Sequence, residues 1–249
     1  MSRLQQKIAV ITGGNSGIGL ATAKAWAAEG ARVIITGRNP ETLAGAATEV
    51  GDGTITVVGD LRESETRTAL VAAVRENGGE VHALFANAGV AMPSPFEAAD
   101  EAHFDSIFDT NVKALYFTTQ ALAPFFVSGT SVIFNTTALI EKGMPGMSVY
   151  AASKAAVRSL ARTLAAEYAD QGVRVNCIAP GPIETPIYGR MGLPNEAVEE
   201  FGQHIQSQVP VKRFGQADEI ARVALFLAST DSSYMTGSEV TVDGGFAQV

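Results

Sequence analysis

The chain has 249 residues, and its 18 Lys and Arg side chains against 26 Asp and Glu give a net charge of −8. This acidic balance argues against nucleic acid as a partner, because nucleic-acid-binding domains usually carry a basic face. The single Cys excludes an intramolecular disulfide, and the sequence lacks the Cys/His spacing of a zinc site. The apolar run Ile8 to Ile11 is too short for a signal peptide, and no stretch is suited to span a membrane. We expect a soluble cytoplasmic protein with no membrane partner.

Short β-branched runs alternate along the chain with longer, Ala-rich stretches at helical spacing. Strands are expected at residues 7–12, 32–36, 55–59, 81–86, 131–135, 173–178 and 239–242. Helices are expected at residues 17–29, 40–50, 64–75, 100–126 (with a bend at Pro124), 149–168, 196–206 and 218–227. This alternation predicts one doubly wound α/β domain over residues 1–249, with helices on both faces of a parallel seven-stranded sheet.

The least regular region lies between residues 181 and 210, where prolines and glycines interrupt the periodic pattern. In a compact domain, an irregular segment of this length is more often a lid over a functional site than a plain connection. We therefore expect residues 186–210 to cover a substrate.

The first expected strand leads through a glycine-rich segment, residues 12–19, into the first expected helix. Gly13, Gly17 and Gly19 permit a tight turn and a close approach of the backbone to a ligand. The following helix offers free N–H groups and the positive end of its dipole to an anion. No Gly-Lys-Ser/Thr sequence follows, so the segment is not a P-loop. It indicates a dinucleotide phosphate site, and the alternative is a purely structural turn.

Three motifs follow one another in a recognisable order. They are Thr12-Gly13 with Gly17 and Gly19, then Asn87-Ala88-Gly89, then Tyr150 with Lys154 four positions later. Together they resemble the short-chain dehydrogenase/reductase family, and the resemblance covers residues 7–245. Residues 209–215 and the ending Val242-Asp243-Gly244-Gly245 are similar to the 3-oxoacyl carrier-protein reductase branch. The resemblance implies a Rossmann-type fold and a nicotinamide cofactor.

Tyr150 and Lys154 are four residues apart on an expected helix, so their side chains share one face. The resemblance makes Tyr150 the catalytic acid/base. A tyrosine pKa of about 10 must fall by roughly 2–3 units, worth about 3–4 kcal/mol, to titrate near neutral pH. An ammonium about 4 Å away supplies about 4 kcal/mol at an effective dielectric constant of about 20. We therefore expect Lys154 to lower the pKa of Tyr150.

The resemblance places a third catalytic residue, usually serine, 13 positions before the tyrosine, where this chain has Thr137. Thr137 keeps a hydroxyl that can polarise a substrate carbonyl, but it adds a methyl group and a stiffer χ1. Its neighbour Thr136 is the less favoured alternative, because adjacent strand residues point to opposite faces. The fourth catalytic residue is Asn111, which in the family holds a water that relays protons between Lys154 and solvent.

The end of the second expected strand indicates which cofactor binds. An acidic residue there would accept the ribose hydroxyls of NAD, whereas this chain has Arg38, which can pair with a 2′-phosphate. We expect NADP(H), with NAD(H) less favoured; alternatively Arg38 is solvated and both cofactors bind. The implied cofactor site comprises Gly13, Asn15, Ser16, Gly17, Ile18, Gly19, Arg38, Asn39, Asp60, Leu61, Asn87, Ala88, Gly89, Tyr150, Lys154, Pro180, Gly181, Ile183 and Thr185.

The expected substrate site contains Thr137 and Tyr150 together with Met144, Met147 and Tyr188, although the methionines could equally be packing residues. The resemblance implies an oxidoreductase that interconverts a small-molecule ketone and a secondary alcohol, uses no metal and forms a homotetramer. The alternative is a non-catalytic NADP-binding sensor or scaffold of the same fold. This alternative is supported by two departures from the family pattern: Thr137 stands in place of the usual serine, and Ala86 stands in place of an asparagine that is usual in the family.

Overall fold

The computed structural model describes residues 2–186, 189 and 195–249, without the side chains of 195–199 and 201. Its centre is the expected parallel seven-stranded sheet, with strand order β3-β2-β1-β4-β5-β6-β9. The strands are β1 (Ile8–Ile11), β2 (Arg32–Gly37), β3 (Ile55–Val58), β4 (Val81–Ala86), β5 (Phe126–Asn135), β6 (Arg174–Pro180) and β9 (Glu239–Val242). A small second sheet pairs β7 (Ile183–Glu184) with β8 (Gly215–Gln216), which the sequence pattern did not predict.

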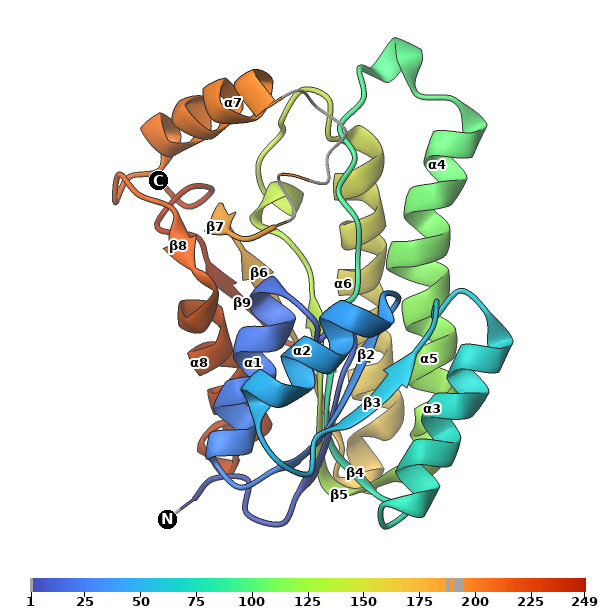
Figure 1. Ribbon diagram of the computed structural model, residues 1–249. Helices are drawn as coiled ribbons and strands as arrows, with labels where there is room; N and C mark the ends of the chain where they lie inside the picture. Colours follow the sequence, from blue (N-terminus) through green and yellow to red (C-terminus); the bar gives the residue numbers. More distant parts are fainter. Residues whose placement is uncertain (1, 187–188, 190–194) are drawn as a thin grey trace.

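Helices cover both faces of the sheet, as Figure 1 shows. On one side lie α1 (Gly17–Ala28), α2 (Pro40–Val50) and α8 (Ala217–Ala228), and on the other lie α3 (Ser64–Glu76), α4 (Glu101–Phe108), α5 (Leu115–Leu122) and α6 (Ser148–Tyr168). Because successive strand residues point to opposite faces, Phe85 joins the apolar core under α1 and α8, whereas Leu84 joins the core under α3 and α6. The remaining helix, α7 (Asn195–Gln208), lies near the C-terminus (Figure 1).

Local signals in the sequence fix several helix ends where they were expected. Asn39 caps α2, its Oδ1 accepting a hydrogen bond from the Thr42 N–H at 3.0 Å, and Pro40 occupies the first helical turn. Gly30 follows α1 with φ of +84°, a conformation that favours glycine after a helix.

The single helix expected over residues 100–126 is wrong. The chain forms α4, then a π-helix (Asp109–Ala114), then α5, and a 3₁₀ turn (Ala123–Phe125) ends the helical segment. Pro124 lies in that turn, so the chain does not bend and continue as a helix but enters β5 at Phe126, earlier than expected. A short π-helix leaves no clear signal in hydrophobic spacing, and such segments are frequent at functional sites.

The strand order reverses at β1, which pairs with β2 on one side and β4 on the other. In open α/β sheets this reversal leaves a crevice at the carboxyl ends of the strands, where ligands bind. The glycine-rich segment leaves β1 at this edge, and the Asn87 segment leaves β4 beside it.

Candidate active site

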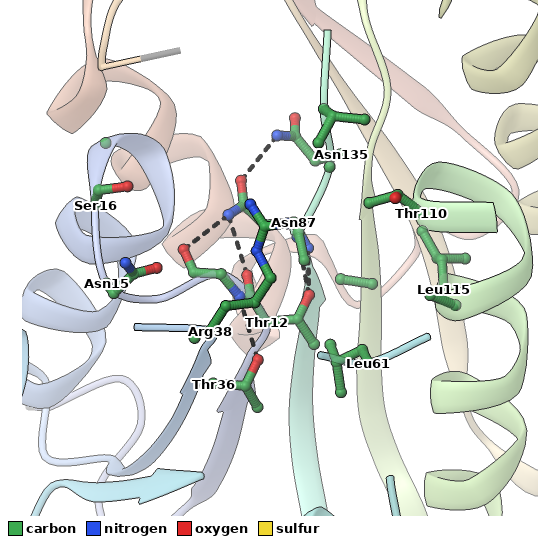
Figure 2. Close-up of a pocket in the computed structure, with 18 of the residues that line it drawn as sticks. Thr12, Asn15, Ser16, Thr36, Arg38, Leu61, Asn87, Thr110, Leu115 and Asn135 are labelled. Atoms are coloured by element: carbon green, nitrogen blue, oxygen red, sulfur yellow. Dashed lines mark hydrogen bonds between the residues drawn. The ribbon is translucent and has the colours of Figure 1, made fainter. Parts of the chain in front are cut away.

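A cleft of about 440 Å³ lies at the carboxyl ends of β1, β2 and β4 (Figure 2). Most residues of the expected cofactor site line it: Gly13, Asn15, Ser16, Gly17, Ile18, Arg38, Asn39, Asp60, Leu61, Asn87, Ala88, Gly89, Tyr150, Lys154 and Thr185. Pro180, Gly181 and Ile183 instead line an adjoining pocket. The fold thus joins segments that are far apart in the sequence into one continuous surface.

The glycine-rich turn has the geometry of a phosphate cradle. Gly13 and Gly17 have φ of +64° and +52°, which side-chain-bearing residues rarely adopt. A Cβ on Gly19 would lie 2.1 Å from the carbonyl oxygen of Gly13, so the first turn of α1 packs directly on the loop. Gly19 therefore allows α1 to pack closely against the loop, and the N-terminus of α1, which borders the cleft, is suited to an anion. These residues fit a nicotinamide dinucleotide.

Arg38 and Asp60 flank the adenosine end expected of such a ligand. Figure 2 shows Arg38 extending from the end of β2 over the cleft. Within the described part of the chain, its guanidinium makes no hydrogen bond or ion pair, so it is available to a phosphate. Asp60 instead pairs with Arg62, whose Nη2 lies 2.8 Å from Oδ2, and this hydrogen bond lowers the pKa of the carboxyl.

Asn87 links the ends of β1 and β4 beneath the cleft. Its Nδ2 donates to the carbonyl oxygens of Thr12 at 3.1 Å and Gly13 at 3.3 Å. Its Oδ1 accepts from Nδ2 of Asn135 at 2.9 Å, and both amides are visible in Figure 2. Asn135 is a site residue that the sequence analysis missed, because its position at the end of β5 carries no motif. Asn135 thus gives Asn87 an amide partner, although the residue before Asn87 is Ala86 and not the asparagine that is usual in the family.

Tyr150 and Lys154 lie on α6 and reach the same cleft, as expected. The expected electrostatics are wrong for this pair, however. Burial raises the pKa of Tyr150, and a hydrogen bond with Thr137 opposes that rise only in part. Burial also lowers the pKa of Lys154 to about 8, and its ammonium donates to the Asn135 carbonyl oxygen at 2.7 Å. Burial therefore sets the direction of both pKa shifts, and neither side chain contributes to the shift of the other.

Thr137, and not Thr136, faces Tyr150. Thr137 hydrogen-bonds the Tyr150 side chain, and its Oγ1 also accepts from the Leu139 N–H at 3.3 Å. The hydroxyl of Thr136 is already engaged with the Ile178 carbonyl at 2.9 Å and the Glu239 carboxylate at 2.7 Å. The structure thus brings the expected hydroxyl to the expected tyrosine.

Asn111 is fully buried within the π-helix. Its Oδ1 accepts from the Val90 N–H at 2.8 Å, and its Nδ2 donates to the Val90 carbonyl and the Ser153 hydroxyl, each at 3.0 Å. A Cβ on Gly89 would lie 3.1 Å from Asn111 Oδ1 and 3.3 Å from Lys154 Nζ, so both polar atoms flank that glycine. The π-helix therefore brings Asn111 close to the lysine.

The adjoining pocket has the position expected for a substrate. Thr137, Met144, Met147 and Tyr150 all line it, so the methionines are at the pocket as well as packed against their neighbours. Tyr188 and residues 187 and 190–194 of the expected lid lie outside the described residues. Cys177 is buried, and burial raises the pKa of its thiol to about 12, as suits a core residue.

The described residues contain no cluster of His, Cys, Asp and Glu that could hold a metal ion. Nor do their helices include one with the length and hydropathy to cross a membrane.

A glycine cradle at the sheet reversal, joined to a half-buried tyrosine and a buried lysine, defines an oxidoreductase built on a dinucleotide-binding fold. The family model described as enoyl-(acyl carrier protein) reductase matches residues 13–247. The chain belongs to the short-chain dehydrogenase/reductase family.

Individual relatives match over nearly their whole length. The chain is 41% identical to an oxidoreductase of Sarocladium schorii, covering 100% of this chain and 99% of the relative. It is 36% identical to the 3-oxoacyl-[acyl-carrier-protein] reductase of Thermotoga maritima, covering 98% of each. Among solved structures, a levodione reductase superposes with a TM-score of 0.87 at 33% identity, covering 98% of this chain and 99% of that one.

Proposed function

We propose that the protein is an NADP(H)-dependent carbonyl reductase that interconverts a ketone and a secondary alcohol. The observation that carries this proposal is the convergence of Thr137, Tyr150 and Lys154 where the cofactor cleft meets the adjoining pocket. Arg38, unpaired within the described chain at the end of β2, favours a cofactor with a 2′-phosphate.

When bound, the reduced cofactor supplies a hydride to the carbonyl carbon. Thr137 and Tyr150 donate hydrogen bonds to the carbonyl oxygen, which stabilises the negative charge that develops there. Tyr150 then gives up its proton, which its raised pKa keeps in place at neutral pH. Lys154 holds the cofactor ribose and, with Asn111 and a water, restores the proton to Tyr150.

The direct test is a panel of ketones assayed with NADPH and with NADH. We expect turnover with NADPH at a higher kcat/KM than with NADH. Cofactor binding without turnover of any ketone would instead support the non-catalytic sensor, and a preference for NADH would contradict the role given to Arg38.

We further propose that the chain works as one domain in a cytoplasmic homotetramer, with residues 186–210 covering the substrate. Aromatic side chains on α4 and α5 support self-association, because Phe104, Tyr116 and Phe117 are 44%, 42% and 40% exposed. Sedimentation at micromolar concentration is expected to give a tetramer, and a monomer would refute this assembly.

A further inference from the structure

The pocket that adjoins the cofactor cleft offers no charged partner to a ligand. It has a volume of about 140 Å³ and shares Asn135, Tyr150 and Thr185 with the cleft. No charged side chain among the described residues lines it. A carboxylate or ammonium group entering it would lose water without gaining a counter-ion, which is strongly unfavourable. The pocket therefore suits an uncharged molecule.

Two polar side chains of the pocket, those of Thr137 and Tyr150, are placed to hydrogen-bond a single carbonyl. Thr137 and Tyr150 face each other across the reacting position, whereas the Thr136 hydroxyl is taken up by Ile178 and Glu239. The remaining side chains of the wall are mostly apolar, among them those of Ala91, Leu139, Met144, Met147, Ile205 and Phe246, and the polar Asn135 and Thr185 lie where the pocket meets the cofactor cleft. An apolar cavity of about 150 Å³ holds one benzene ring. A single six-membered ring is thus close in size to this pocket, which opens on one side onto the cofactor cleft.

Phe246 forms the wall contributed by the C-terminal segment. Its side chain is 2% exposed and packs against Ala138, Ile205 and Val209. The carboxylate of Asp243 accepts hydrogen bonds from the backbone N–H groups of Gly245 and Ala247, each at 2.8 Å. These hydrogen bonds order the segment as a turn, which holds the Phe246 ring in place.

Lys142 lies over the face of the same ring. Its ammonium lies 4.0 Å from the centroid of the Phe246 ring and donates a hydrogen bond to the Phe246 carbonyl oxygen at 2.8 Å. Lys142 itself is not among the residues that line the pocket. A cation–π contact and a charged hydrogen bond thus fix Phe246 on both its ring and its backbone.

We propose that Phe246 is the specificity-determining wall of the site, held in place by Lys142, and that it restricts the substrate to an uncharged ketone about the size of one six-membered ring. This inference rests on the proposed function, because it takes the pocket between Thr137 and Tyr150 as the substrate site.

The test compares three ketones with NADPH and NADH: cyclohexanone, a cyclohexanone with a phenyl group opposite the carbonyl, and one with a carboxylate there. Wild type is expected to reduce cyclohexanone with the highest kcat/KM. In Phe246→Ala the ratio of kcat/KM for the phenyl ketone to that for cyclohexanone should rise at least about tenfold. Lys142→Met, which keeps the ring but removes its clamp, should raise the ratio by a smaller factor.

Phe96→Ala is the matched control, because Phe96 is 78% exposed and lies outside the pocket lining. It should leave the ratio at the wild-type value. An unchanged ratio in Lys142→Met and in folded Phe246→Ala would overturn the inference while leaving the proposed function intact. So would a wild-type preference for the carboxylate ketone. Failure of wild type to reduce any of these or other ketones would overturn the proposed function itself.

Discussion

Tyr150 and Lys154 show how burial decides the behaviour of a charged pair. The sequence places them on one helix face, and a Coulomb argument then predicts a lowered tyrosine pKa. In the structure both are desolvated, which raises the pKa of Tyr150 and lowers that of Lys154. The neutral phenol is thereby favoured, which suits a proton donor in ketone reduction.

The shift at Lys154 makes a prediction about stability and pH. Its pKa falls from 10.5 to about 8 on folding, so between these values the unfolded chain binds more protons than the folded protein. Stability attributable to Lys154 must then rise with pH, by about 2 kcal/mol between about pH 8 and about pH 10. Urea unfolding of wild type and Lys154→Met over this range measures it as the difference between the two proteins. A difference that stays flat or falls with pH would contradict the burial of the charge.

Two variants at Thr137 separate the effect of its hydroxyl on activity from the effect of its shape. Thr137→Val keeps the branching but removes the hydrogen bond to the carbonyl oxygen, so kcat/KM for ketone reduction should fall about 10²–10³-fold. Thr137→Ser restores the hydroxyl and should remain within about tenfold of wild type. Equal activity in all three proteins would show that the hydroxyl does not act on the substrate.

Among the elements, strands and capped helices could be predicted closely, because local signals define them. Asn39 with Pro40 begins α2, and the β-branched run of β4 was expected with its observed bounds. The π-helix around Asn111 could not be predicted, since its backbone conformation depends on the buried contacts of Asn111 with Val90 and Ser153. The β7–β8 pair was also missed, because two-residue strands have no periodicity to detect.

The turn between β1 and α1 gives a prediction at the scale of elements. Gly19→Ala places a Cβ against the Gly13 carbonyl, which must displace the turn from the helix. We expect NADPH affinity to fall at least about tenfold and the free energy of unfolding to drop by about 1–3 kcal/mol. Fluorescence titration and urea unfolding measure the two effects.

Gly45→Ala is the matched control for this change. Gly45 lies in α2, and an added Cβ there meets nothing within 4 Å. Alanine favours the helix by about 0.5–1 kcal/mol over glycine, so this variant should be slightly more stable with unchanged NADPH affinity. If both variants bound NADPH like wild type, the turn would not be a phosphate cradle.

For the whole molecule, the topology followed from the alternation of strands and helices, and the motifs located the cofactor cleft. The wall of the substrate pocket did not follow, because Phe246, Lys142 and Asn135 carry no motif. Phe246 and Lys142 meet only after the chain has folded, and so do Asn135 and Asn87. Sequence spacing reveals residues that act within one element more readily than contacts between distant ones.

The net charge of −8 makes Arg38 important for cofactor binding, because the overall electrostatic field of the molecule repels a polyanionic cofactor. Arg38→Asp should lower the ratio of kcat/KM with NADPH to that with NADH by about 10²-fold. Arg32→Asp changes the charge equally at the opposite end of β2 and should leave the ratio near wild type. Equal ratios in the two variants would mean that charge acts only through the overall field.

The central claim is that Tyr150 donates the proton in a reduction that uses NADPH. The most direct measurement is the turnover of Tyr150→Phe with a ketone that wild type reduces, combined with its NADPH dissociation constant. We predict that turnover falls by about 10³-fold or more while the dissociation constant stays within about threefold of wild type. Wild-type turnover in this variant would contradict the account.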